Sequence, residues 1–187
     1  MKFLNLEYLD EALSLKRGVI LSTAHIGNWD MGSLLDHKDL KLKVVANLDF
    51  PLAGYIIKLI RSRIGFDVIP AKKGIREIVR ALKQNQPLCM LSDISSNYPS
   101  DYVNFLNHKV FFPKAAFQIA SSRNCPILPV FIIRKKPFEF DCYIENYIEP
   151  KKDYKITMQE WANSFEKYVI NYPNQWYIFL PMEIKNG

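Results

Sequence analysis

The stretch GVILSTAHIGNWD, residues 18–30, contains the local pattern on which the predicted fold depends. Its first apolar residues are continuous rather than spaced at helical intervals, which favours a short buried strand. Gly27 then interrupts the strand, and Asp30 carries a negative charge suited to the first turn of a helix that we expect to run to about His37. The stretch therefore predicts a strand, a turn and a helix, with His25 at the carboxyl end of the strand.

Strands continue to alternate with helices along the rest of the chain. Further strands are predicted at residues 42–46, 66–69, 87–91, 127–133 and 138–144, and further helices at 51–64, 75–82, 113–123 and 158–171. The last of these strands alternates apolar and polar residues, as an edge strand with one wet face would. Residues 94–109 are polar and turn-rich, and we expect a functional loop there.

This order of elements predicts the fold class. With 187 residues the chain is long enough for one core and too short for two comfortable domains. We therefore expect a single α/β domain, 1–187, with a mostly parallel central sheet flanked by helices on both faces. Ligands of such sheets usually bind beyond the carboxyl ends of the strands, where His25 and Asp93 both fall.

The positive charge is concentrated in one part of the chain. Residues 41–83 carry 10 basic and 3 acidic side chains, a net +7 against +6 for the whole chain. Such a block suits an anionic partner, which could be nucleic acid, lipid headgroups, a phosphorylated substrate or an acidic carrier protein. A solvated basic face with no partner is the alternative. No nucleic-acid recognition motif accompanies the charge, so nucleic acid is not an expected partner.

Several other site chemistries are disfavoured. The sequence contains neither the G-x-S-x-G nucleophile elbow nor a glycine-rich phosphate loop, and its three scattered histidines predict no metal site. The three cysteines lie far apart in apolar stretches, as buried thiols do. The longest uncharged apolar runs fall far short of the roughly 20 residues that cross a bilayer, so no membrane span is expected.

His25 and Asp30 form the best candidate for catalysis. A strand that ends near His25 and a turn through Gly27 can fold the Asp30 carboxylate back onto the imidazole. The carboxylate would then fix the tautomer of the ring, which leaves the other nitrogen free to accept a proton from a substrate hydroxyl. The five-residue spacing also fits a structural interpretation, with the histidine hydrogen-bonded at a strand end and Asp30 as a helix cap.

The chain resembles the bacterial lipid A biosynthesis acyltransferases, which belong to the lysophospholipid acyltransferase superfamily. The matching segments follow the family order: LEYLDEALSLKRGVILSTAHIGNWD, IRSRIGFDVIP, IREIVRALKQNQPLCMLSD, VNFLNHKVFFPKAAFQIASSRNCPILPVFIIR and YPNQWYIF. The first contains the family's H-x-x-x-x-[DE] motif, with Asp30 where the family commonly has glutamate. The family's N-terminal membrane-anchor region has no counterpart in the 24 residues before His25, and we expect the acyltransferase domain alone.

The resemblance implies transfer of a fatty acyl group from a thioester, on acyl carrier protein or coenzyme A, to a hydroxyl of a lipid acceptor. A lipid A precursor or related glycolipid would be the acceptor, and the protein would act peripherally at the anionic cytoplasmic face of the bacterial inner membrane. His25 would be the general base, Asp30 its orienting partner and Arg61 a catalytic cation. The expected substrate-binding residues are Asn28, Arg63, Asp93 and Lys114.

The expected reaction needs no cofactor. The alternative is a catalytically inactive, peripheral membrane-binding module, in which the basic block and the tryptophans Trp29 and Trp176 serve an anionic bilayer surface. Acyl-transfer activity in the purified protein distinguishes the two hypotheses.

Overall fold

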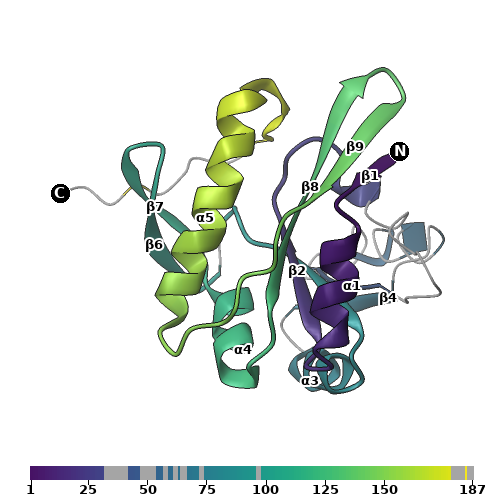
Figure 1. The fold of residues 1–187 in the computed structure, drawn as a ribbon, viewed down its shortest axis with the longest axis vertical. Coiled ribbons are helices and arrows are strands. Elements are labelled where there is room, and N and C mark those ends of the chain that lie inside the picture. The colour runs from purple at the N-terminus through teal and green to yellow at the C-terminus, as the bar shows by residue number, and fades with distance from the viewer. Residues whose placement is uncertain are drawn as a thin grey trace.

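A computed structural model of the chain describes residues 1–31, 42–46, 54–56, 59–60, 63, 67–71, 74–95, 98–177 and 184 (Figure 1). Its elements are, in order, β1 (Lys2–Leu4), α1 (Glu7–Ser14), β2 (Val19–Thr23), β3 (Lys43–Ala46), β4 (Asp67–Pro70), α3 (Ile75–Lys83), β5 (Pro87–Leu91), β6 (Ser100–Phe105), β7 (His108–Pro113), α4 (Ala115–Arg123), β8 (Ile127–Lys136), β9 (Glu139–Ile144), α5 (Tyr154–Asn171) and the short 3₁₀ helix η3 (Pro173–Gln175). None of the helices in these residues is long and apolar enough to cross a bilayer.

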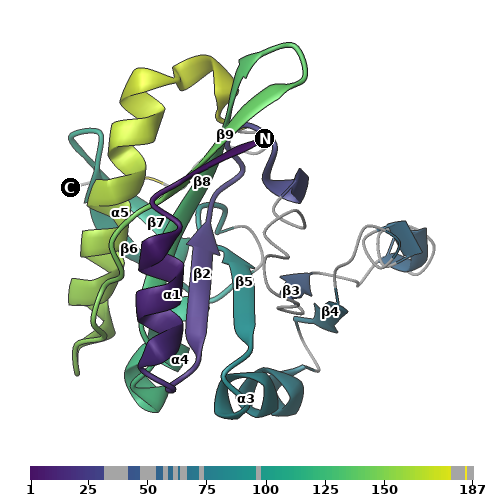
Figure 2. The same cartoon turned by 45° about the vertical axis from the view of Figure 1, so that its right-hand side comes forward.

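Seven strands form one sheet in the order β1-β9-β8-β2-β5-β3-β4 (Figure 2). Every neighbouring pair is parallel except β8 and β9, which form an antiparallel hairpin. The prediction of an α/β chain with a mostly parallel sheet is therefore confirmed. The predicted helix over residues 30–37 and most of that over residues 51–64 lie outside the described residues.

The strand of the opening stretch is buried along its whole length. All five residues of β2 are buried, and because successive side chains of a strand point to opposite faces, they enter two separate hydrophobic clusters. Ile20 belongs to the cluster that includes residues of α3, α4 and α5, whereas Val19 and Leu21 pack in the cluster that includes Leu9 and Ala12 of α1. The continuous apolar run in the sequence reflects this burial.

Residues 94–109 do not form the predicted loop. Half of the segment, residues 100–105 and 108–109, belongs to β6 and the start of β7, an antiparallel hairpin that forms its own two-stranded sheet next to α5. Buried and exposed side chains alternate along β6: Val103 and Phe105 are buried, while Tyr102 and Asn104 are exposed. The period of two was present in the sequence, but the many polar residues on the wet face concealed it.

β9 is not the predicted edge strand. The three residues of β1 pair with it in parallel, from Lys2 opposite Asp141 to Leu4 opposite Tyr143, and β1 lies at the edge instead. A strand of three residues is too short to give a periodic signal, so the sequence could not reveal the added neighbour.

Trp161 of α5 joins the helix to the central sheet. Its ring is fully buried and packs against four phenylalanine rings: Phe112, Phe117, Phe131 and Phe165. Its Nε1–H donates a hydrogen bond of 3.1 Å to the main-chain oxygen of Ser22 in β2. A tryptophan buried in this way contributes both apolar area and a satisfied polar contact.

We expect Trp161→Phe to lower the free energy of unfolding by about 2–4 kcal/mol, because it leaves a cavity and removes the only donor that Trp161 offers to the buried Ser22 oxygen. Ile156→Val, at a half-exposed position on the same helix, should change it by less than about 0.5 kcal/mol. Urea denaturation followed by circular dichroism measures both. Equal stabilities of the two variants would contradict this role of Trp161.

Candidate functional site

The candidate site forms where β2 and β5 end side by side. These strands are parallel neighbours, with Thr23 opposite Leu91, so His25 and Asp93 both lie two residues beyond matched positions. The Ser92 N–H donates to the Thr23 oxygen at 2.9 Å, which continues the pairing past the strand ends. The register of the two strands thus brings together residues that lie 68 positions apart in the sequence.

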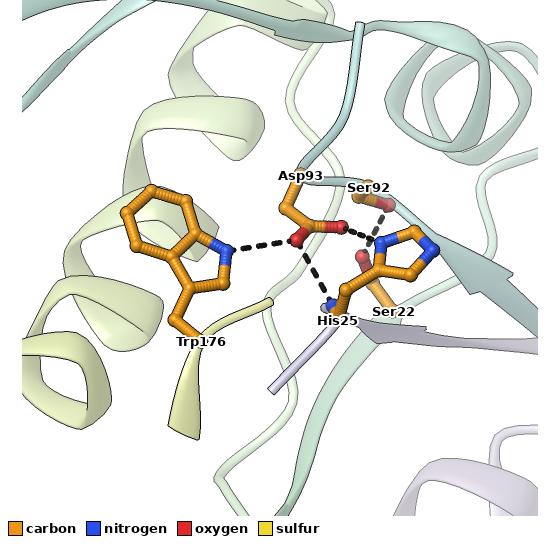
Figure 3. Close-up of polar contacts among 5 residues, drawn as sticks. All are labelled: Ser22, His25, Ser92, Asp93 and Trp176. Carbon is orange, nitrogen blue, oxygen red and sulfur yellow. Dashed lines mark hydrogen bonds and ion pairs between the residues drawn. The ribbon is translucent and has the colours of Figure 1, made fainter. Parts of the chain in front are cut away.

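The buried Asp93 carboxylate is the centre of the site (Figure 3). Its Oδ1 lies 2.8 Å from Nδ1 of the His25 ring. Its Oδ2 accepts hydrogen bonds from the His25 main-chain N–H at 2.9 Å and from Nε1–H of Trp176 at 3.0 Å. A buried carboxylate is stable only with such partners, and these contacts hold Asp93 in one orientation.

The Asp93 contact determines which nitrogen of His25 is available. A carboxylate only accepts hydrogen bonds, so Nδ1 of a neutral His25 must carry the proton, and Nε2 then has a free lone pair. Figure 3 shows Nε2 on the side of the ring away from Asp93. Because the His25 side chain is partly exposed, Nε2 can accept a proton from a group that approaches the site.

The turn after His25 requires glycine. Gly27 has a φ of +60°, and a β-carbon added to it would lie 1.8 Å from the main-chain oxygen of Ile132 in β8. Its N–H donates to the Gln175 oxygen at 2.8 Å. No other residue type fits so close to β8 in this conformation, so Gly27 fixes the path of the chain directly after His25.

The P-x-Q-W segment near the C-terminal end of the chain completes the site. The Gln175 side chain accepts from the Arg134 N–H and donates to the Arg134 oxygen, both at 2.9 Å. The Tyr177 N–H donates to the His25 oxygen at 2.7 Å. Gln175 was not among the residues singled out from the sequence, and Trp176 was named there only as a membrane contact in the alternative hypothesis. The sequence signal for their place in the site was this short motif.

A cavity of about 320 Å³ lies against the turn that follows His25. The ring centroid of Trp29, one of the lining residues, is 4.9 Å from that of His25 and 5.5 Å from that of Tyr177. The lining combines aromatic, amide and charged groups: Gly27, Asn28, Trp29, Asp30, Arg134, Phe140, Gln175 and Tyr177. The lining can therefore contact a partly polar molecule.

The structure gathers some of the predicted site residues and not others. His25 contacts Asp93, and Asn28 and Asp30 line the neighbouring cavity. Asp93, predicted as a binding residue, occupies the place at Nδ1 of His25 that the sequence favoured for Asp30. Lys114 is half-buried at the N-terminal cap of α4, and Arg63 is an exposed helical residue. Arg61 lies outside the described residues.

The buried cysteines are unreactive thiols. Burial raises the pKa of the Cys125 thiol to about 11 and that of the Cys142 thiol to about 12, so both remain protonated at neutral pH. Within the described part of the chain, no group of three or more His, Cys, Asp or Glu side chains could hold a metal ion.

Comparisons with known proteins identify the family. The model of the family described as "Bacterial lipid A biosynthesis acyltransferase" matches residues 1–182. The chain is also 26% identical, over 192 aligned residues, to a protein named phosphatidylinositol mannoside acyltransferase from Mycolicibacterium smegmatis. That alignment covers 97% of this chain and 62% of the relative. The chain belongs to the bacterial lipid A biosynthesis acyltransferase family.

The Asp93 contact predicts the tautomer of His25. We expect ¹⁵N NMR of labelled histidine to show the proton of the neutral His25 ring on Nδ1, and Asp93→Asn to move it toward Nε2, because an amide can donate to Nδ1. Asp30→Asn is the matched control, and the exposed His108 gives an internal reference signal. A change of tautomer in Asp30→Asn with none in Asp93→Asn would assign the orienting role to Asp30.

Proposed function

We propose that this member of the lipid A biosynthesis acyltransferase family transfers a fatty acyl group from a thioester to a hydroxyl group of a lipid. The donor would be acyl carrier protein or coenzyme A, and the acceptor a lipid A precursor or a related glycolipid. The name of the mycobacterial relative, which refers to a mannose-bearing lipid, supports this class of acceptor. The proposed location is peripheral, at the cytoplasmic face of the bacterial inner membrane.

One observation carries the proposal: a histidine ring that a buried carboxylate orients by its Nδ1. The same arrangement serves enzymes in which histidine removes a proton from a hydroxyl nucleophile. The carboxylate stabilises the imidazolium that forms when Nε2 accepts the proton. In this proposal Asp93 orients His25, and Asp30 acts from the neighbouring cavity that it lines.

The reaction can be followed atom by atom. Nε2 of His25 removes the proton of the acceptor hydroxyl while its oxygen attacks the thioester carbonyl carbon, which gives a tetrahedral oxyanion. The oxyanion collapses, the carbon–sulfur bond breaks, and the leaving thiolate takes the proton from the imidazolium. The products are an ester and a free thiol, and the histidine is regenerated.

The remaining candidates supply charge and contacts in this scheme. Arg61 is proposed to stabilise the oxyanion, because a fixed cation favours the charge that develops on the carbonyl oxygen. Asn28 lines the cavity and would meet the acceptor. Arg63 and Lys114 would contact the anionic parts of the substrates. The excess of basic residues in 41–83 would also favour encounter with an acidic carrier protein.

We expect His25→Ala to reduce the rate of acyl transfer at least about a hundredfold, because general-base catalysis typically contributes 10²–10⁴. The assay combines purified protein, a labelled acyl thioester and an acceptor glycolipid, and measures the labelled ester. His108→Ala, at an exposed position on β7, is the matched control and should retain the full rate. Unchanged turnover of His25→Ala would refute the mechanism.

Asp93→Asn should lower the rate of acyl transfer by about 10² or more, because it removes the charge that stabilises the imidazolium. The KM for each substrate should change little, since the carboxylate faces His25 and Trp176 rather than the cavity. Steady-state kinetics on folded variants provides the measurement. A loss that appears in KM alone would mean that Asp93 binds substrate and does not orient the base.

A further inference from the structure

The β8–β9 hairpin extends beyond the rest of the sheet. Only the first part of β8 pairs with β2, through Ile127 to Pro129. Arg134 still contacts the Gln175 side chain, and the last main-chain bridge from β8 to the opening stretch joins Ile132 to Gly27. Lys136 lies four residues farther on, about 13 Å along an extended strand. Figures 1 and 2 show the hairpin tip projecting on the same side as the C-terminal end of α5.

A strained and fully exposed phenylalanine forms the tip. The two-residue loop consists of Pro137 and Phe138, and Phe138 is 95% exposed with a φ of +64°. Turns with proline in the first loop position usually place glycine or asparagine in such a second position. Of the other six non-glycine residues with positive φ in the described chain, four are asparagines, Leu106 packs against the core, and Lys16 directly follows the C-terminal cap of α1. A bulky residue that folding does not favour indicates a function.

Three consecutive cations precede the tip. Arg134, Lys135 and Lys136 are exposed. Lys135 donates to the Tyr172 hydroxyl at 3.0 Å, a contact that raises its pKa and keeps it charged. Lys136 forms a long ion pair, 3.6 Å, with the exposed Glu139. With Asp141, the hairpin has three cations and two carboxylates, so its net charge is positive.

The neighbouring end of α5 has the same mixed character. Tyr172, the C-terminal cap of this helix, contacts Lys135 through its hydroxyl and its ring. Just before it, Lys167 and Ile170 are exposed, Ile170 by 63%. Exposed apolar side chains among cations are typical of surfaces that lie at the boundary between headgroups and acyl chains.

The hairpin also belongs to the wall of the site. Arg134 and Phe140, on its two strands, line the cavity together with Trp29 and Asp30. A molecule that contacts the tip therefore lies on the side of the sheet where the carboxyl ends of the strands and His25 are located. A membrane lipid must approach that side from a bilayer if its hydroxyl is to reach Nε2 of His25.

We propose that the tip of the β8–β9 hairpin binds the surface of an anionic bilayer. Phe138 enters the boundary between headgroups and acyl chains, and Lys135 and Lys136 lie among the lipid phosphates. The contact holds the carboxyl ends of the strands, where His25 lies, toward the membrane. This inference rests on the proposed function for one premise only, that the acceptor is a membrane lipid.

The test measures binding of the full chain to sedimented vesicles of phosphatidylcholine with and without phosphatidylglycerol. We expect Phe138→Gly to weaken binding to the anionic vesicles at least about tenfold, because it removes the inserted ring. The same change relieves the strained backbone, so the melting temperature should not fall. Double replacement of Lys135 and Lys136 by glutamine should remove most of the preference for anionic vesicles.

Tyr102→Ser provides the matched control. Tyr102 is also an exposed aromatic residue with two lysines nearby, Lys109 and Lys155, but it lies on the separate β6–β7 hairpin. Its replacement should leave vesicle binding unchanged. Equal binding by Phe138→Gly and the unsubstituted chain, or an equal loss in Tyr102→Ser, overturns the proposal. Self-association without vesicles that Phe138→Gly abolishes also overturns it, since the tip would then bind a second copy.

The two proposals can fail separately. His25→Ala should bind vesicles as the unsubstituted chain does, because the ring lies in the site and not at the hairpin tip. Vesicle binding that depends on Phe138, without detectable acyl transfer by the unsubstituted chain, would refute the proposed function and leave the membrane contact standing. Acyl transfer by the unsubstituted chain, with no effect of Phe138→Gly on vesicle binding, would support the proposed function and refute the membrane contact.

Discussion

The candidate site depends on the burial of one carboxylate. Asp93 accepts from the His25 main chain and from Trp176, and pairs with the His25 ring. A carboxylate removed from water without such donors would be strongly unfavourable. The ends of β2 and β5 and the P-x-Q-W segment must therefore all be in place before the charge can be buried. The orientation of the histidine therefore depends on the same contacts that allow the charge to be buried.

Trp176 connects this carboxylate to the hydrophobic core. Its Nε1–H faces Asp93, while its ring lies edge-on to Phe105 of β6 and Phe165 of α5, with centroids 5.5 Å and 5.4 Å away. Tryptophan suits this position because it combines a large apolar ring with a single polar donor. The β6–β7 hairpin, which forms a sheet of its own, thereby supports the residue that fixes Asp93.

The sequence predicts the helices and strands that have a regular hydrophobic period. It does not predict the elements and site contacts that depend on residues far apart in the chain. β2, β3, β5 and α3 lie within one or two residues of their predicted ranges, because their hydrophobic periods are local properties of the chain. β1 joins the sheet only because a neighbour is available to pair with it. The same limit applies to the site. Asp30 is five residues from His25 and attracts attention, whereas Asp93 reaches Nδ1 only through the register of two strands.

The direction of the strands explains why the site residues and the hairpin tip both lie toward the carboxyl ends of the central strands. In a parallel sheet each crossover helix returns the chain to the amino ends of the strands. The loops at the carboxyl ends are therefore free to carry functional residues. The antiparallel pair β8 and β9 departs from this pattern. Because β9 follows β8 after only two residues, β8 can run past the level of Gly27 without a helix to return it. The ten residues of β8 thus begin in the core with Ile127 and end among exposed cations at Lys136. A single strand, β8, therefore connects the buried core beneath His25 to the exposed hairpin tip, and both His25 and the tip lie toward the carboxyl end of β8.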